Sequence, residues 1–218
     1  KSDGTIVAWG RPGFTLSNPP STLTDVVDIA CYGFFGLALT ADGTVAGWGD
    51  NSSGQQNNPS GLGTPFAIGA GSSTAYAINT EGTVLGWGYG GNGETSPPAA
   101  SALWRAVSGG GFHALGLKSD GTVAGWGFGG YATPPSGLSG IVAIGAGFRH
   151  SMALSSSGLI TTWGGNDNGE RDVPSGLNDV FAIAAGNKFS LAIKEIGVAT
   201  APTITLQPTD ETANEGAS

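Results

Sequence analysis

The sequence has few of the residues from which catalytic and metal sites are usually built. Its 218 residues include one cysteine and two histidines, and only 11% are charged. Cys31 has no second cysteine for an internal disulfide, and because it lies in an apolar, glycine-rich stretch we expect a buried, inert thiol. There is no serine elbow, no cysteine paired with a histidine and no cluster with metal-ligand spacing. We therefore expect no enzyme activity, no cofactor and no metal.

Positive charge and long apolar runs are also scarce. Eight Lys and Arg residues against sixteen Asp and Glu residues give a net charge of −8. No basic stripe is available to neutralise phosphates, so we expect no nucleic-acid partner. No run approaches the roughly 18 apolar residues of a membrane span, and no basic-then-apolar segment opens the chain. We expect no membrane insertion, with any export signal already removed.

Glycine is abundant by contrast, and much of it belongs to a repeat. Forty glycines accompany a hydrophobic content of 39%, which is high enough for a folded core. The phrase DGTVAGWG occurs at 42–49 and again at 120–127, with EGTVLGWG at 81–88 between them. Trp-Gly recurs with spacings of 39, 39, 39 and 37 residues at Trp9, Trp48, Trp87, Trp126 and Trp163. A period of this length is typical of a solenoid or a propeller.

Each repeat has the pattern of short paired strands. After the Trp-Gly and a proline comes a segment that ends large, small, large, as in Leu37-Ala38-Leu39. This alternation is typical of a strand buried on both faces. Asp-Gly or an equivalent follows, which predicts a hairpin before the returning Trp-Gly strand. Helix signals are almost absent. We predict an all-β protein, a β-propeller of repeated short antiparallel blades with tryptophan packed between blades.

The two ends of the repeat region complement each other. The first Trp-Gly strand has no Leu-Ala-Leu strand before it, and the last such strand, at 191–193, has no Trp-Gly strand after it. Pairing residues 4–9 with 189–194 would complete a fifth blade and leave no unpaired edge. We predict a five-bladed ring over residues 1–198. The alternative is a fragment of a seven-bladed ring, because KSDG at 1–4 repeats KSDG at 118–121, where the strand ending Leu115-Gly116-Leu117 precedes it.

Several features of the repeat together resemble a known family. They are Trp-Gly, the proline, segments such as IGAGFRHSMAL, and the Asn51, Gly54 and Gln55 of WGDNSSGQ. The repeat resembles that of the regulator of chromosome condensation family, and five units over residues 1–198 carry the resemblance. Its short period is similar to that of the propeller-type β-lactamase inhibitor. The resemblance implies a binding scaffold, such as an exchange factor for small GTPases, an inhibitor or a photoreceptor, and usually seven blades.

The last residues break the repeat. TAPTITLQPTDETANEGAS at 200–218 resembles the opening strand of a bacterial immunoglobulin-like domain. Such a short segment cannot fold alone, so we expect residues 199–218 to be a linker and the severed start of that domain. The resemblance implies a bacterial protein that is secreted or exposed at the cell surface, and we expect an extracellular location.

Candidate binding residues are those that vary inside the fixed frame. Between the glycine-rich bend and the Leu-Ala-Leu strand, each repeat has a variable pair: Gly33-Phe34, Ser72-Ser73, Gly111-Phe112, Phe148-Arg149 and Asn187-Lys188. Repeat symmetry predicts that these pairs gather on one face, with side chains pointing off the frame. Aromatic residues and Arg are frequent interface anchors. The predicted partner-binding residues are Phe34, Phe112, Phe148, Arg149 and Lys188. For all of these except Lys188, the similarity to the inhibitor implies the same role.

Three functions are open at this point. We favour a non-catalytic scaffold that binds a protein partner through one face of the ring. The alternative is a lectin-like propeller with a glycan or small-molecule ligand, although the variable pairs are too dissimilar for five equal sites. An enzyme would need a titrating group, and His113 and His150 share one repeat position, which favours packing or a hydrogen bond to the next blade. The variable pairs also fit ordinary exposed turn residues.

Two further features have a structural interpretation. The stretch NDNGE at 166–170 lacks the alternating carboxylates of a calcium loop and aligns with DNSSGQ, so we expect a polar turn. Trp104 stands off the repeat period, and an apolar core side chain is expected at its position, which aligns with Val26, Pro65, Ile141 and Val180.

Overall fold

The computed structural model describes residues 4–9, 18–99 and 103–195. Within these ranges the chain forms five antiparallel sheets and one four-residue helix, α1 (Gly129–Ala132). Four sheets have three strands each, and the fifth has two. Each sheet corresponds to one sequence repeat, and we number them as blades 1 to 5. The prediction of an all-β protein built from repeated short antiparallel blades is confirmed.

The strands keep the same order in every blade. The first strands are β1 (Val26–Tyr32), β4 (Pro65–Ala70), β7 (Trp104–Gly109), β10 (Ile141–Ala146) and β13 (Val180–Ala185). The second strands are β2 (Phe35–Thr40), β5 (Thr74–Asn79), β8 (His113–Lys118), β11 (His150–Ser155) and β14 (Ser190–Lys194). The third strands are β3 (Val45–Gly49), β6 (Val84–Gly88), β9 (Val123–Gly127) and β12 (Ile160–Gly164). Blade 5 has no third strand among the described residues.

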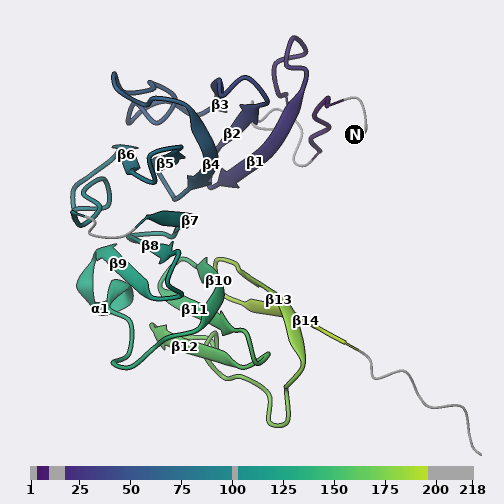
Figure 1. Ribbon diagram of the computed structural model, residues 1–218, viewed down its shortest axis with the longest axis vertical. Helices are drawn as coiled ribbons and strands as arrows, with labels where there is room; N and C mark the ends of the chain where they lie inside the picture. Colours follow the sequence, from purple (N-terminus) through teal and green to yellow (C-terminus); the bar gives the residue numbers. More distant parts are fainter. Residues whose placement is uncertain (1–3, 10–17, 100–102, 196–218) are drawn as a thin grey trace, which may run out of the picture.

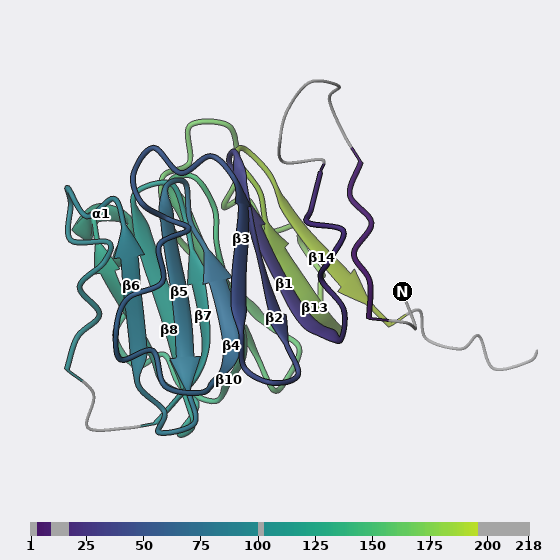
Figure 2. The same ribbon diagram turned by 90° about the horizontal axis from the view of Figure 1, so that it is seen from above.

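The first strand of each blade lies on the inside of an arc. β1, β4, β7, β10 and β13 pack against one another in that order, and all five border a small space of about 210 Å³ at the centre. Figure 1 shows the blades following one another along an open arc, with β1 near one end and β14 at the other. Figure 2 shows the strands side by side, with the connecting turns gathered at two opposite ends. The radial stacking of short sheets is that of a β-propeller.

The second strands form the core of the four complete blades. Residues 35–39, 74–79, 113–117 and 150–154 are all buried, as the large-small-large alternation predicts. The third-strand tryptophans, from Trp48 to Trp163, are each at most 9% exposed. Trp87, Trp126 and Trp163 pack in buried clusters that join two neighbouring blades. Trp104 is 3% exposed and meets Trp126 edge-on, with 5.9 Å between ring centroids. Its assignment to the core is confirmed.

The Asp-Gly phrase forms the turn between the second and third strands. Its glycine has a positive φ in each complete blade: 85° at Gly43, 72° at Gly82, 77° at Gly121 and 78° at Gly158. The carbonyl of this glycine accepts a hydrogen bond from the first strand of the next blade, as from Trp104 to Gly82 at 3.1 Å. Blade 2 begins with Pro65, which has no N–H to donate. The turn therefore sets both the hairpin and the stacking of blades.

The predicted pairing of residues 4–9 with 189–194 is wrong. Residues 4–9 form no strand, and β14 pairs with β13 alone. Instead, the 4–9 segment lies against residues 26–29, and the Gly4 carbonyl accepts a hydrogen bond from the Val26 N–H at 3.1 Å. The physical reason is the open arc, which keeps this segment with β1 at one end while β14 lies at the other (Figure 1). Whether a complete ring has five or seven blades stays a prediction.

The ends of the arc expose residues that are buried in the middle. Leu191 and Ile193 of β14 are each 57% exposed, and Trp9 is 87% exposed. Cys31 is also exposed, so the prediction of a buried thiol is wrong. Cys31 belongs to the innermost strand of blade 1 and borders the open centre of the arc. The apolar residues that flank Cys31 in the sequence therefore do not cover its side chain in the folded chain.

The predicted linker and immunoglobulin-like start at 199–218 lie outside the described residues. The boundary between this segment and a repeat domain at 1–198 thus stays a prediction. In the described part of the chain, no helix has the length and apolar character needed to cross a membrane.

Candidate binding face

The five variable pairs form the turns between the first and second strands. In blades 2 to 4 the glycine before the pair donates to the carbonyl after it, as from Gly71 to Thr74 at 2.8 Å, so the pair itself is a two-residue turn. In blades 2 to 4 the turn also bonds to the next one, as the Ser72 N–H does to the Gly110 carbonyl at 2.9 Å and the Gly111 N–H to the Gly147 carbonyl at 3.1 Å. These bonds place successive turns side by side on one end of the arc, which we call the turn face.

Glycine is required where these turns meet. A Cβ on Gly71 would lie 2.9 Å from the carbonyl oxygen of Gly110, and one on Gly147 would lie 2.7 Å from that of Gly186. Real Cβ atoms do not approach backbone oxygens so closely, so any larger residue would push the turns apart. The glycine-rich bend read from the sequence therefore keeps the variable pairs close together.

The loops that follow the Trp-Gly strands extend this face outward. The carbonyl of the second residue in each pair accepts a hydrogen bond from the residue after Trp-Gly, as from Tyr89 to Ser73 at 2.9 Å and from Phe128 to Phe112 at 2.8 Å. Tyr89 is 52% exposed and Phe128 is 47% exposed. Helix α1 begins directly after Phe128, at the same end of the strands (Figure 2).

Four aromatic rings gather over blades 3 and 4. We call Phe112, Phe128, Tyr131 and Phe148 the aromatic cluster. The Phe112 and Phe148 rings lie 5.0 Å apart between centroids at a tilt of 58°, and Phe128 and Tyr131 lie 4.7 Å apart. Phe112 also meets Tyr131 at 6.5 Å, which joins the two pairs. Such distances are those of favourable ring contacts. Phe112 and Phe148 are thus half-buried against each other, and the expectation that they point freely off the frame is corrected.

One cation borders the cluster. The Arg149 guanidinium lies 5.6 Å from the centroid of the Phe148 ring and 3.5 Å from the Asp167 carboxylate. Both charged side chains remain well exposed, at 48% and 74%. An exposed ion pair of this kind adds little stability. Its effect is to hold the planar guanidinium of Arg149 beside an aromatic surface.

The predicted site residues do not all meet. Phe112, Phe148 and Arg149 are brought together. Phe34 is 61% exposed on the first turn, and the Ser72-Ser73 turn separates it from Phe112 along the arc. Lys188 is exposed on the last turn. The turn face therefore has an aromatic centre over blades 3 and 4 and two outlying residues.

Phe128 and Tyr131 were not among the binding residues predicted from the sequence. Both belong to the loop after Trp126, which is two residues shorter than its equivalents before the proline. The shortened loop folds as α1 and carries Tyr131 over the turns. The change of loop length was the signal that pointed to this place.

The turn face rests on a buried hydrogen-bonded layer. His113 and His150 are fully buried, and each Nε2 bonds to a serine hydroxyl of the next blade: Ser151 at 2.8 Å and Ser190 at 3.0 Å. Each hydroxyl in turn donates to a loop carbonyl, that of Tyr131 in the first case and that of Glu170 in the second. Because the serine proton is used, Nε2 must be the protonated nitrogen. The prediction of a hydrogen bond to the next blade is confirmed.

Burial keeps these imidazoles neutral. Desolvation lowers the pKa of His113 to about 4, with repulsion from His150 as a smaller cause. Desolvation also lowers the pKa of His150, partly opposed by the charge of Glu170. The Nδ1 atoms of both rings have no hydrogen-bond partner among the described residues. A proton on Nδ1 of either ring would thus be buried without a hydrogen-bond acceptor.

The acidic turn at 166–170 is stabilised by hydrogen bonds from its own side chains. The Glu170 carboxylate accepts hydrogen bonds from the side chain and backbone N–H of Asn168, which lower the pKa of Glu170 to about 2. The Asn166 side chain bonds to Asp172 at 2.9 Å. The polar side chains thus satisfy the turn, as predicted. No group of three or more His, Cys, Asp or Glu residues in the described ranges could hold a metal ion.

The repeat matches a known family pattern, and the fold matches known propellers. The regulator of chromosome condensation (RCC1) repeat matches residues 26–55 and 141–170. No curated protein sequence gives a significant match. The ectodomain of the Arabidopsis thaliana receptor kinase ACR4 superposes with a TM-score of 0.68 at 20% identity, over 85% of this chain and 66% of that one.

Two further solved structures are similar. Prp20p from Saccharomyces cerevisiae gives a TM-score of 0.64 at 21% identity, over 78% of this chain and 55% of that one. Human WBSCR16 gives 0.66 at 19% identity, over 78% and 58%. At these identities the likeness shows the fold alone, and this chain spans about half to two thirds of each structure. The similarity to the β-lactamase inhibitor stays a prediction. The chain thus shares the β-propeller fold of these structures, and its residues 26–55 and 141–170 carry the regulator of chromosome condensation repeat.

Proposed function

We propose that this chain is a non-catalytic scaffold that binds a protein partner through the turn face, with the aromatic cluster as the anchor. The observation that carries the proposal is the packing of Phe112 against Phe148 at 5.0 Å, with Arg149 over the edge of the pair. Large rings with few rotatable bonds lose little entropy on binding, and aromatic residues and Arg are enriched at the centres of interfaces.

The cluster is already arranged for binding. Tyr131 packs on Phe112 and on the buried His113, at 6.5 Å and 6.0 Å between ring centroids. The rings therefore have little freedom to lose when a partner docks. The Arg149 fork suits a carboxylate on the partner, which would replace or share its contact with Asp167. We expect the complementary surface to present an apolar side chain beside an acidic one.

The family supports a binding role. Propellers with this repeat are generally non-catalytic binding or regulatory proteins, and the fold fits a protein-interaction scaffold. The structure of Prp20p is described with its binding to Gsp1p and histones, and another shows Kap60 bound to yeast RCC1 (Prp20). We propose the same general role here, with a different and unidentified partner.

We also propose that the protein acts outside the cell, in a bacterial source. The support is the resemblance of residues 200–218 to the start of a bacterial immunoglobulin-like domain. Mild protease treatment of intact source cells tests this location. Loss of the protein without loss of a cytoplasmic marker is expected, and protection until lysis would contradict it.

Affinity capture with two matched double variants tests the binding role. Phe112→Ala/Phe148→Ala removes the paired rings. Phe66→Ala/Phe181→Ala removes two exposed phenylalanines, 47% and 59% exposed, near the starts of β4 and β13 and so at the opposite end of the strands. We expect the wild-type chain and the second variant to capture the same protein from an extract of the native source, and the first variant to lose it by ~10-fold or more.

The outcomes separate the alternatives. Loss only in Phe66→Ala/Phe181→Ala would move the site to the opposite end. Equal capture by all three chains would contradict a role for either aromatic set. Several strong signals on a glycan array, with no captured protein, would favour the lectin-like alternative.

A further inference from the structure

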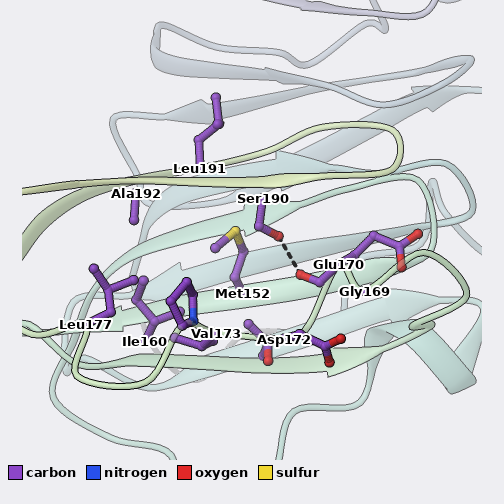
Figure 3. Close-up of a pocket in the computed structure, with 12 residues that line it drawn as sticks. Met152, Ile160, Gly169, Glu170, Asp172, Val173, Leu177, Ser190, Leu191 and Ala192 are labelled. Carbon is purple, nitrogen blue, oxygen red and sulfur yellow. Dashed lines mark hydrogen bonds between the residues drawn. The ribbon is translucent and has the colours of Figure 1, made fainter.

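Blade 5 has an open groove where the complete blades have a tryptophan. The groove has a volume of about 320 Å³ and lies between β14, the preceding blade and the loop that joins them. Figure 3 shows Ser190 and Ala192 of β14 pointing into it, while Leu191 points away. Met152, Ile160 and Leu177 converge from the other side (Figure 3).

In blade 2 the equivalent positions surround Trp87. Trp87 belongs to a buried cluster that includes Ala75 and Ala77 on the second strand of its own blade. Leu37 and Val45 of blade 1 belong to the same cluster, and Leu62, in the loop between the two blades, packs against it. The Trp87 indole Nε1 donates a hydrogen bond to the Gln55 carbonyl at 2.9 Å.

The groove of blade 5 repeats this set residue by residue. Counted along the repeat, Ser190 and Ala192 correspond to Ala75 and Ala77. The preceding blade contributes Met152 at the position of Leu37 and Ile160 at that of Val45. The loop between the blades contributes Glu170 at the position of Gln55 and Leu177 at that of Leu62. The groove is therefore a tryptophan socket without its tryptophan, and we call it the blade 5 socket. Beside it, the outer edge of β14 has no paired strand among the described residues.

One segment of the chain has the sequence that fits this socket. GTIVAWG at 4–10 matches GTVAGWG at 43–49, which contains the third strand of blade 1. In the structure Trp9 is 87% exposed. The segment is held at the other end of the arc by the bond between Gly4 and Val26 (Figure 1). Within one molecule, the 4–9 segment and the blade 5 socket thus lie at opposite ends of the arc.

We propose that the blade 5 socket binds residues 4–9 of a second copy of this chain, so that molecules associate head to tail by strand addition. The register follows from blade 1, where Gly36 lies opposite Trp48 and Leu37 opposite Gly47. Trp9 then lies opposite Ser190, and Ala8 opposite Leu191. Backbone pairing along β14 supplies affinity, and the socket supplies specificity for tryptophan. The Trp9 indole N–H would donate to the Glu170 carbonyl, as Trp126 does to Glu94 at 2.6 Å.

The head-to-tail geometry follows from the two different surfaces involved. A strand donated at one end of the arc and accepted at the other is a heterologous contact, which forms rings or longer chains of molecules. The packing that would form is the same as the packing between blades inside one molecule. The 4–9 segment and the blade 5 socket contain none of the turn-face residues. The proposed association can therefore be tested independently of the proposed function.

A disulfide between two molecules tests the register. All chains carry Cys31→Ser to remove the native thiol, and Ala8→Cys chains are mixed with Leu191→Cys chains under mild oxidation. We expect a mixed disulfide dimer, because the two positions face each other across the strands. The matched control replaces Ala8→Cys by Val7→Cys, whose side chain points to the other face of the strand. It should yield ~10-fold less dimer at the same time point.

Two results would overturn the proposal. One is a dimer yield no higher than that of the Val7→Cys control. The other is an internal disulfide in a chain that carries both Ala8→Cys and Leu191→Cys at high dilution, since this would mean that each molecule fills its own socket.

Sedimentation of the full chain gives a second, independent reading. The average mass of the wild-type chain should rise with concentration, and Trp9→Ala should weaken this association ~10-fold or more. Val142→Ala makes a small truncation at a residue of β10 that is 41% exposed and belongs neither to the 4–9 segment nor to the socket, so this control should associate as the wild type does. A wild-type chain that stays monomeric up to about 100 µM would reject the second copy as the occupant.

Discussion

The middle and the ends of the arc place the same repeat positions in opposite environments. Trp126 of blade 3 is 6% exposed, whereas Trp9, in the same phrase, is 87% exposed. Leu115 of β8 is fully buried, whereas Leu191, its equivalent in β14, is 57% exposed. The residue types agree, so the difference comes from the neighbours. In this fold a residue of the repeat joins the core only where neighbouring strands and blades cover it, and β14 has no third strand beside it among the described residues.

The difference between the two regions is also one of stability. Blades 2 to 4 have a neighbour on each side, and the buried apolar clusters draw on residues of adjacent blades. The two ends have one neighbour each. We therefore expect mutations in the middle to cost much more than identical mutations at the ends.

Matched leucine substitutions should show the largest difference. Leu115→Ala removes a fully buried side chain and should lower the free energy of unfolding by about 3 kcal/mol or more. Leu191→Ala removes an exposed side chain at the equivalent position and should cost less than about 1 kcal/mol. Urea denaturation monitored by circular dichroism measures both. Equal losses would mean that Leu191 of β14 is as buried in solution as Leu115 of β8.

Acid should destabilise the middle of the arc through His113. Its pKa is about 4 in the folded chain and about 6.5 when unfolded. Between these values the unfolded chain binds more protons, so the free energy of unfolding falls as the pH falls from 6.5 towards 4. The full effect is about 3 kcal/mol at most. Denaturation curves at a series of pH values measure this slope.

His113→Phe is the matched control for the pH effect. Phenylalanine occupies the same repeat position at Phe35 and Phe189, so the ring should fit. The variant lacks the titrating nitrogen and should lose much of the slope between pH 6.5 and 4. A variant with an unchanged slope would assign the acid sensitivity to the carboxylates instead.

Trp126 and Trp163, both in complete blades, should contribute differently to the free energy of unfolding, because only one of them makes an indole hydrogen bond within the described residues. The Trp126 indole donates to the Glu94 carbonyl at 2.6 Å, whereas the indole nitrogen of Trp163 is buried without a partner in the described chain. Trp126→Phe should therefore cost about 1 kcal/mol more than Trp163→Phe, in urea denaturation. The reverse order would show that Trp163 has an acceptor that the structure lacks.

The aromatic cluster should contribute least to stability. Phe112→Ala/Phe148→Ala removes two half-buried rings that contact each other, and we expect a loss of about 1 kcal/mol. Phe34→Ala, at an exposed end position, should leave the melting temperature nearly unchanged. A collapse of the fold in the double variant would make these rings core residues and not binding residues.

The sequence predicted the blade because the blade is local. Trp-Gly, Asp-Gly and the large-small-large strand lie within one period, and each specifies a strand or turn through its own neighbours. The exposure of Cys31 and the pairing of residues 4–9 depend on which blade lies next to them. The neighbouring blade is in turn set by the curvature of the arc. No single repeat encodes that curvature, so both predictions failed.

The candidate site was predicted in part for a similar reason. Repeat symmetry placed Phe112, Phe148 and Arg149 on one face, and the structure joins them. Tyr131 entered the cluster because one loop lost two residues and folded as α1. A departure from the repeat has no template elsewhere in the chain, so its conformation could not be predicted from the other units.

Footprinting of the aromatic side chains tests the central claim, that the partner docks on the turn face. Hydroxyl radicals oxidise exposed rings, and mass spectrometry measures the extent at each residue with and without the captured partner. We expect protection of Phe112, Tyr131 and Phe148 in the complex, with Phe66 and Phe181 oxidised as in the free chain. Protection of Phe66 and Phe181 with the cluster still oxidised would place the partner at the opposite end and contradict the account.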